Sequence, residues 1–563
     1  MPKPCTQCSA EFAVTDEDRA LLDKMTPAFN GKGFPIPDPL LCFDCRLGRR
    51  LAFYNCRSLY KRTCDYSHKP IISIYTPDKP FTVYEKNIWY SDSWDPMDYG
   101  RDFDFSRPFF EQFRELMETV PQLSRGVVGE NENSEYTNDN YKLKNCYLVF
   151  DGEQGESCSY GNTFGMVRDC MDFLGLMQCE LCYECTACSG SYNLKYSRYC
   201  SNCSDSWFLR NCGGCKNCFG CANLRQKQYC IFNEQKTKEE YLEFMKSFDS
   251  SKHSVIQAML KKTENFFLPQ PVKYLQGEKN IDCVGDSLLN CKNAYMCFEG
   301  THLQDCRYCT GCLMGGKDNC DVHIWGNNME LCYNCCVVGD QSQNVIAGYY
   351  ITQGVSNVYY STFCSRNSSD LFGCIGLRQK HHCIFNKQYT KEEYEELAGR
   401  IAAHMIETGE WGQFFPPEIS AFAYNETKAQ EYFPLSKEEV LKRGWQWSDF
   451  EPVVEAEKSI PSSQLPDDSE RIPDDVLNWA ITCEKTGKLY KLNAKELAFY
   501  REHRLPIPRR HPDQRHNDRM ALKNPFVVYD RDCLKCNKSV QTTHSPEMDK
   551  PVYCEKCYQE DVY

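Results

Sequence analysis

Residues 179–221 read CELCYECTACSGSYNLKYSRYCSNCSDSWFLRNCGGCKNCFGC. Within this stretch Cys179, Cys200 and Cys221 recur with a period of about 21 residues, and Cys158 continues the same period towards the N-terminus. A fixed period of this length is typical of one coil of a parallel β-helix, in which equivalent side chains of successive coils stack about 4.8 Å apart. Cysteine is small and usually buried, so an inward column of cysteines would fill a narrow core. We therefore predict a mainly β protein with about 21 residues per coil.

The cysteine-rich region is duplicated. The string FGCANLRQKQYCIFNEQKTKEEY at 219–241 matches FGCIGLRQKHHCIFNKQYTKEEY at 372–394, and each copy ends in a helix signal with a capping box. Such helices would cover the open end of a coil stack, whose strand edge would otherwise be exposed. The sequence thus predicts two β-helix segments with capping helices, at 141–248 and 286–405.

The ends of the chain carry cysteine pairs with metal-ligand spacing. Two C-x-x-C pairs separated by a short insert are typical of zinc ribbons and treble clefs, whose four thiolates form a closed, structural zinc site. We predict two such sites and hence about two Zn²⁺ ions. The predicted ligands are Cys5, Cys8, Cys42 and Cys45 at one end, and Cys533, Cys536, Cys554 and Cys557 at the other.

Each end also resembles a copy of the other, because both contain two ribbon-like halves. Where the first end has Cys42 and Cys45, the last has His511 and Gln514, so no metal is expected there. The predicted units are a zinc-ribbon-like unit at 1–90, an aromatic and acidic docking segment with a helix at 91–140, a connector at 249–285, a helix and acidic linker at 406–475, and a C-terminal zinc-ribbon-like unit at 476–563.

Composition narrows the classes of function. The 563 residues carry a net charge of −13, contain 38 cysteines and are 41% hydrophobic, which permits packed cores. No run of about 18 apolar residues or signal-peptide stretch occurs, so we expect no membrane span and a cytoplasmic location. Reduced thiols are then the expectation, although metal binding by Cys212, Cys215, Cys218 and Cys221, or a disulfide ladder in an oxidising compartment, would use the same cysteines.

Two further groups of residues are candidates for function. Arginines beside both zinc signals could contact phosphate, although interleaved acids also fit a solvated face. Asp151 and Asp172 share the spacing of the cysteines and could form a carboxylate pair of the kind used on polysaccharides, although an ordinary surface ladder gives the same spacing. The nucleic-acid candidates are Arg46, Arg49, Arg50, Lys61, Arg62, Arg509, Arg510 and Arg515.

Several long strings carry a resemblance to a known family. KPCTQC at 3–8, LCFDCRLGRRLAFYN at 41–55 and WDPMDYGRDFDFSRPFFEQF at 94–113 are among them, together with the TKEEY helices, WGQFFPPEIS and RRHPDQRHNDRMALKNP. On these strings the chain resembles a family of uncharacterised cysteine-rich zinc-ribbon proteins of candidate phyla radiation bacteria. The resemblance implies a cytoplasmic bacterial protein and no particular activity.

The sequence therefore favours a non-enzymatic, zinc-binding scaffold whose β-helix surface contacts a macromolecule, and RNA or the ribosome is a candidate for that partner. A protein-interaction platform without nucleic acid and a carbohydrate-active β-helix enzyme are the alternatives. No nucleophile elbow, phosphate loop, H-E-x-x-H or dinucleotide fingerprint is present.

Overall fold

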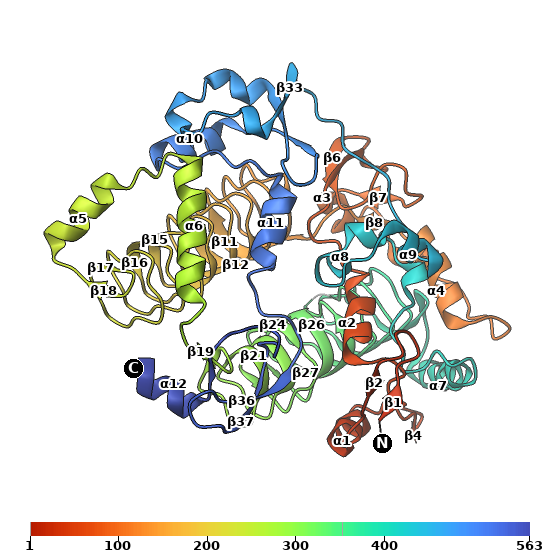
Figure 1. Cartoon of the computed structure of the whole chain (residues 1–563). Coiled ribbons are helices and arrows are strands. Elements are labelled where there is room, and N and C mark those ends of the chain that lie inside the picture. Colours follow the sequence, from red (N-terminus) through yellow and green to blue (C-terminus); the bar gives the residue numbers. More distant parts are fainter. Residues whose placement is uncertain (1, 352, 563) are drawn as a thin grey trace.

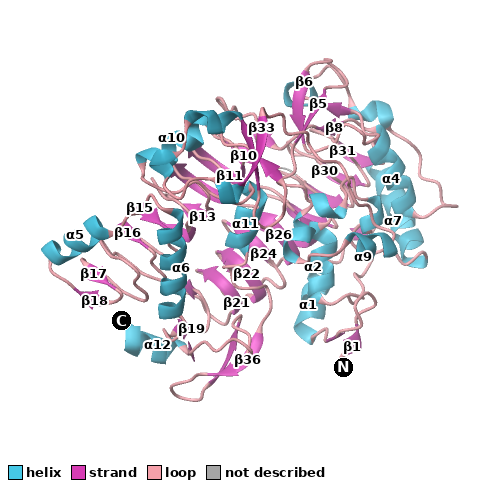
Figure 2. Cartoon of the chain, turned by 45° about the horizontal axis from the view of Figure 1, so that its top comes forward, coloured by secondary structure: helices cyan, strands magenta, loops and turns pink. Residues whose placement is uncertain are grey.

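Two separate stacks of short parallel strands form the body of the protein (Figure 1). The computed structural model describes residues 2–351 and 353–562. We call the stack at 127–235 the first β-helix and the stack at 277–388 the second β-helix. Helices and the terminal units surround the two stacks (Figure 2). The prediction of a mainly β fold with two β-helix segments between terminal metal-type units is confirmed.

The first β-helix has 12 residues per coil, as the hydrogen bonds between equivalent positions of neighbouring coils show. Thr137 pairs with Val149, and Asn162 pairs with both Phe150 and Leu174, so paired residues lie one coil apart in the chain. Isolated bridges continue the same step between the strands. Its strands are β9 (Val127–Val128), β10 (Thr137–Tyr141), β11 (Val149–Glu156), β12 (Asn162–Arg168), β13 (Leu174–Met177), β14 (Thr186–Ser189), β15 (Tyr192–Lys195), β16 (Ser204–Trp207), β17 (Cys230–Ile231) and β18 (Glu234–Gln235).

The chain turns at every third residue. From Asp139 to Asp172, each third residue has a positive φ near 50°, including Lys142, Asn145 and Leu148. Non-glycine residues rarely adopt this left-handed conformation, and Asn and Asp tolerate it best, which accounts for their abundance between the cysteines. Four short sides with four such corners make one coil, and one residue of each side points inward.

The predicted coil length of about 21 residues is wrong, although the periodicity behind it is real. Inward positions recur every third residue, so cysteines separated by any multiple of three all face the core. The apparent period of 21 residues equals two coils of 12 residues minus one side of three residues. Cys158, Cys179, Cys200 and Cys221 therefore lie on four different sides of one core rather than in one column. The true column through Cys158 contains Cys146, Cys170 and Cys182, each one coil from the next.

The second β-helix uses coils of 11, 12 and 13 residues. Phe298 pairs with Thr310 across a shorter coil, whereas Ser356 pairs with Gln343 and Ser369 across longer ones. Its strands, after the short β19 (Val272–Lys273), are β20 (Gly277–Glu278), β21 (Val284–Leu289), β22 (Tyr295–Thr301), β23 (Leu303–Gln304), β24 (Thr310–Leu313), β25 (Gly316–Lys317), β26 (Cys320–Trp325), β27 (Met329–Cys336), β28 (Gln343–Ile346), β29 (Ser356–Tyr359), β30 (Ser369–Phe372), β31 (His381–Ile384) and β32 (Lys387–Gln388).

Both stacks begin earlier than predicted. The first starts at β9, inside the predicted docking segment, and the second starts at β20, inside the predicted connector. The duplicated ends match the sequence: β17 and β18 lead into α5 (Lys238–Ser247), and β31 and β32 lead into α7 (Lys391–Glu407). The capping boxes are formed at Thr237 and Thr390, whose side chains accept from the main chain three residues on.

Thiols and aliphatic side chains fill both cores. Cys158 and Cys182 are 0% exposed, and their sulfur atoms donate to main-chain carbonyls two residues earlier and nine residues later. In the second core, burial raises the pKa of Cys335 to about 12, so this thiol is neutral. Among the described residues, no group of central cysteines has the geometry of a metal site, and no cysteine is joined in a disulfide. Packing therefore explains the central cysteines.

The terminal units are built from small elements. The first unit contains β1 (Lys3–Pro4), β2 (Glu11–Phe12), α1 (Asp16–Lys24), β3 (Ala28–Phe29), β4 (Lys32–Gly33), α2 (Phe43–Leu51), β5 (Tyr60–Thr63), β6 (Pro70–Ser73), β7 (Val83–Tyr84) and α3 (Lys86–Trp89). The last contains β33 (Lys458–Pro461), β34 (Trp479–Thr482), β35 (Leu489–Tyr490), α10 (Ala494–Glu502), α11 (Pro512–Met520), β36 (Tyr529–Asp532), β37 (Ser539–Thr542), β38 (Val552–Tyr553) and α12 (Glu555–Val562).

The aromatic segment after α3 lies between the N-terminal unit and the second β-helix. It passes through a 3-10 turn (Pro96–Tyr99), α4 (Phe109–Thr119) and β8 (Gln122–Leu123), and it packs on the last coil of the second β-helix. The remaining helices are α6 (His253–Phe267), α8 (Lys428–Tyr432) and α9 (Lys437–Lys442). Within the described residues, none of the helices is long and apolar enough to cross a membrane.

Candidate metal centres and ion-pair clamps

Four nearly identical turns lie at the starts of the ribbon-like halves. Each begins with a cysteine, at position 5, 64, 483 or 533, and the main-chain N–H four residues later donates to that cysteine's carbonyl at 2.9–3.0 Å. The residue making this bond has a positive φ in every case, and it is Ser9, His68, Gly487 or Asn537. The backbone is therefore the same in all four halves, whether or not the other ligands are present.

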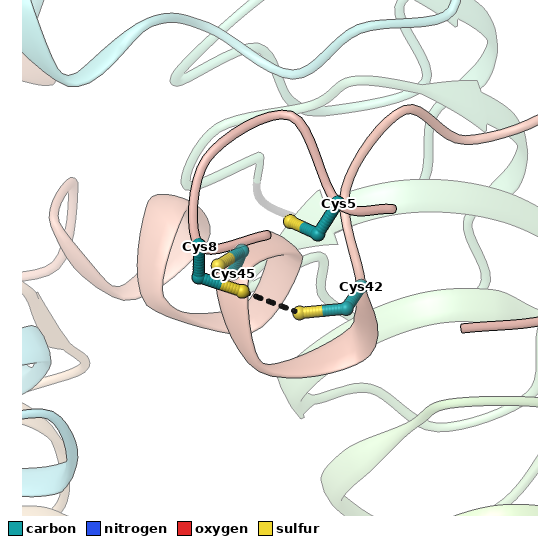
Figure 3. Close-up of side chains that lie close together, drawn as sticks. All are labelled: Cys5, Cys8, Cys42 and Cys45. Atoms are coloured by element: carbon teal, nitrogen blue, oxygen red, sulfur yellow. Dashed lines mark hydrogen bonds between the residues drawn. The ribbon is translucent and has the colours of Figure 1, made fainter. Parts of the chain in front are cut away.

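The first complete set surrounds one point between this turn and the start of α2. Figure 3 shows the sulfurs of Cys5, Cys8, Cys42 and Cys45 gathered together, with Cys8 Sγ 3.7 Å from Cys42 Sγ. All four ligand atoms lie within 4.8 Å of one another. Contact with the Cys45 thiol lowers the pKa of Cys42 to about 5, and the N-terminus of α2 also favours thiolate. Four sulfurs in a closed shell fit a structural metal ion.

The second complete set joins the turn at Cys533 to α12. Cys536 Sγ lies 3.7 Å from Cys554 Sγ, and the N–H of Cys554 donates to Cys533 Sγ at 3.2 Å. Although burial raises it, main-chain donors from Cys554 and Cys536 bring the pKa of Cys533 down to about 6. With Cys557 the four ligand atoms lie within 4.8 Å, so both predicted four-cysteine sets are assembled.

The other two halves keep the turn but not the ligands. In the first unit, Cys64 Sγ accepts from the N–H of Glu85 at 3.3 Å, which matches the Cys533–Cys554 bond, but Ser67 stands where the second cysteine would be. In the last unit, Cys483 is followed by Thr486, and His511 caps α11. Among the described residues, neither Cys64 nor Cys483 belongs to a group that could hold an ion, and the absence of a metal in these halves stays a prediction.

Arginine pairs hold both units on the β-helices. From α2, Arg46 Nε lies 2.7 Å and Arg50 Nη2 lies 3.1 Å from the carboxylate of Asp321, on the second β-helix. From α11, the equivalent Arg515 and Arg519 bind the carboxylate of Asp172 on the first β-helix, the latter at 3.1 Å. Both carboxylates are 0% exposed. We call these two groups the N-terminal clamp and the C-terminal clamp.

Each terminal unit bridges the two β-helices. The N-terminal unit clamps the second β-helix through α2, while its β7 pairs with β8 just before the first β-helix. The C-terminal unit clamps the first β-helix through α11, while its β38 pairs with β19 just before the second. Each terminal unit is thus clamped to one β-helix and pairs a strand next to the start of the other, an arrangement that local sequence could not show. The aligned arginines four residues apart in RLGRR and RHNDR were the available signal.

Most predicted nucleic-acid residues are engaged within the chain. Arg46, Arg50 and Arg515 are buried in the clamps. Arg510 is paired with Glu484 and Asp518. Three others donate to main-chain carbonyls: Arg49 to that of Phe415, Arg62 to those of Thr76 and Phe81, and Arg509 to that of Leu465. Lys61 is exposed to solvent. A phosphate contact by these residues stays a prediction, and for the clamp arginines it would require breaking a buried ion pair.

The predicted carboxylate pair is not assembled. Asp172 is held in the C-terminal clamp, whereas Asp151 binds Lys428 and the hydroxyl of Tyr54. Asp151 instead lies close to Asp139 and Cys56, a group that was not predicted. Asp151 and Asp172 therefore do not share an exposed groove.

Comparisons with known proteins add little. No protein-family model matches the chain, and a search of curated proteins finds no similar one. Among solved structures, a putative acetyltransferase from Desulfovibrio desulfuricans G20 is similar over 43% of this chain and 63% of its own length, with 9% identity and a TM-score of 0.11. That likeness is too slight to carry an argument, and the family resemblance stays a prediction.

Proposed function

We propose that the chain is a non-enzymatic scaffold, stabilised by two zinc ions, that presents its β-helix surfaces to a protein partner. The observation that carries the proposal is the use of both terminal units as clamps across the two β-helices. Several charged groups that were candidates for chemistry or phosphate binding are instead used in this assembly, because Asp321 is buried with Arg46 and Arg50, and Asp172 is buried with Arg515 and Arg519. A protein partner is favoured over RNA because of this and because of the net charge of −13.

Zinc is the metal of choice for these sites. Four thiolates in a closed tetrahedral shell match its preference, and such a site contributes directly to folding. A reducing compartment, such as the cytoplasm, suits a chain whose described cysteines form no disulfide and pack as weak donors.

Metal analysis tests the zinc part of the proposal. Native protein purified without added metal should contain two zinc ions per chain, as the two four-cysteine sets require. Cys8→Ser and Cys536→Ser should each lower the content by one ion, whereas Cys64→Ser serves as the matched control and should leave it unchanged. A metal-free chain with native secondary structure would contradict the proposal.

The partner is tested by capture from native lysate with and without nuclease. A protein that remains bound after nuclease treatment would support the platform. Capture that is lost on nuclease treatment and weakens steeply with salt would favour RNA instead.

A further inference from the structure

The duplicated ends of the two β-helices are covered differently. In the second β-helix, Leu377, Phe385 and Asn386 belong to the last coil and are all 0% exposed. The matching residues of the first β-helix are Leu224, Phe232 and Asn233, and all three are only half-buried. The sequences around them are nearly the same, so the difference comes from what lies on top.

Residues 91–106 are what covers the second β-helix. The N–H of Arg101 donates to the Phe385 carbonyl at 3.1 Å, and the Asn386 side chain donates to the Pro96 carbonyl at 3.0 Å. Met97 packs against the core, and Asp102 pairs with Lys387 at 2.6 Å. This segment therefore closes the coil with main-chain bonds, an apolar plug and an ion pair.

The surroundings of the first β-helix match in part, although Phe266 of α6 also packs on Phe232, with ring centroids 5.3 Å apart. Tyr558 of α12 bonds Asn223 of the last coil at 3.1 Å, while Trp89, the equivalent residue of α3, packs against Gly376, the counterpart of Asn223. Figure 1 shows α12 close to the end of the first β-helix. In the part of the chain that is described, no hydrogen bond from another segment reaches the carbonyl of Phe232.

The charges around the last coil of the first β-helix indicate which kind of segment would bind there. Residues 91–106 contain five aspartates and one arginine, with the aromatic residues Trp94, Tyr99, Phe103 and Phe105. At the uncovered coil, Lys227 and Lys262 are exposed, and Lys262 Nζ lies 4.5 Å from the ring centroid of Phe232. Glu234, on β18, is paired with Lys236. A basic rim around half-buried Leu224 and Phe232 complements an acidic segment with aromatic side chains.

We propose that Leu224, Lys227, Phe232, Asn233 and Lys262, here called the open end, form a docking site for an extended acidic and aromatic segment of a partner protein. The inference rests on the proposed function and specifies the chemical character of the partner segment that would bind. The occupant would bond the Phe232 carbonyl and the Asn233 side chain and would place apolar side chains on Leu224, as residues 91–106 do in the other half.

A synthetic peptide of residues 91–106 is the probe. Labelled peptide titrated with the full chain should bind saturably at one site, and Leu224→Asp should weaken binding by about ten-fold or more. Lys262→Glu, at an exposed position, should weaken it in the same direction without touching the core. Leu489→Asp is the matched control, since Leu489 is 38% exposed in the C-terminal unit and remote in sequence from the open end. A peptide with asparagine in place of its aspartates should also bind about ten-fold more weakly.

Three results would overturn the inference. One is the absence of saturable binding up to about 1 mM peptide at low salt. Another is binding that neither Leu224→Asp nor Lys262→Glu alters, which would place the peptide elsewhere. The third is a chain that self-associates through this end, so that Leu224→Asp dissolves an oligomer while the peptide does not bind. A chain with two zinc ions that fails these tests would lose the docking inference alone, whereas a chain without zinc would lose the proposed function.

Discussion

Removing the carboxylate of Asp321 tests the clamps most directly. The N-terminal clamp contains no second carboxylate: beyond Asp321, Arg46 donates to the Leu41 carbonyl and Arg50 to the Asn334 side chain. Asp321→Ala would leave two buried guanidinium groups without a counter-ion. Breaking a buried ion pair in this way costs about 3–5 kcal/mol, because the remaining charge stays out of water.

The C-terminal clamp should be less sensitive. There Arg515 keeps Glu496 at 3.4 Å and Arg519 keeps Glu184 at 2.8 Å after Asp172 is removed. Asp172→Ala should therefore cost less than Asp321→Ala, about 2–3 kcal/mol. An exposed pair sets the baseline: Glu118→Ala breaks its contact with Arg114, whose side chain is 51% exposed, and should cost below about 1 kcal/mol.

Thermal unfolding with zinc in excess measures the order. For a cooperative unit of about 150–250 residues, about 3–5 kcal/mol corresponds to a fall in Tm of roughly 6–20 °C. Limited proteolysis within α2 and α11 then shows which unit has been released. If Asp321→Ala lowers Tm no more than Glu118→Ala does, the clamp does not hold the unit and the reasoning fails.

Three other predictions concern protonation, thiols and packing. Burial, together with Lys550 and Arg531, lowers the pKa of His544 to about 4, so the folded state binds fewer protons than the unfolded state. The contribution of His544 to stability should therefore be full above pH 6.5 and should fall towards pH 4 by up to about 3 kcal/mol. Unfolding measured across this pH range should show a flatter profile for His544→Gln. Under native conditions the central thiols, such as Cys158 and Cys182, should resist alkylation, whereas chelation should expose Cys8 and Cys536; mass spectrometry reads the sites, and early labelling of the core would count against the packing. A Cβ at Gly161 would lie 1.9 Å from the Phe173 ring, so Gly161→Ala should lower the free energy of unfolding by about 1–3 kcal/mol, and an unchanged value would show that the core can relax.

The sequence alone determined the features that depend on local spacing. The C-x-x-C pairs predicted both four-cysteine centres, because the turn that presents such a pair is formed by neighbouring residues. The capping boxes at Thr237 and Thr390 were readable for the same reason. The repeat of inward cysteines established a β-helix, but not its coil length, because inward positions recur every third residue and many spacings are then consistent with one core.

Only the tertiary structure decided which coils face one another and what holds the ends. The coil length is set by hydrogen bonding between neighbouring coils, as from the Asn162 N–H to the Phe173 carbonyl, and not by the identity of the cysteines. The clamps join residues that are far apart in the chain, Arg46 to Asp321 and Asp172 to Arg515. An arginine that is buried against a carboxylate reads in sequence like an arginine on a basic surface, because burial and partner are properties of the folded chain.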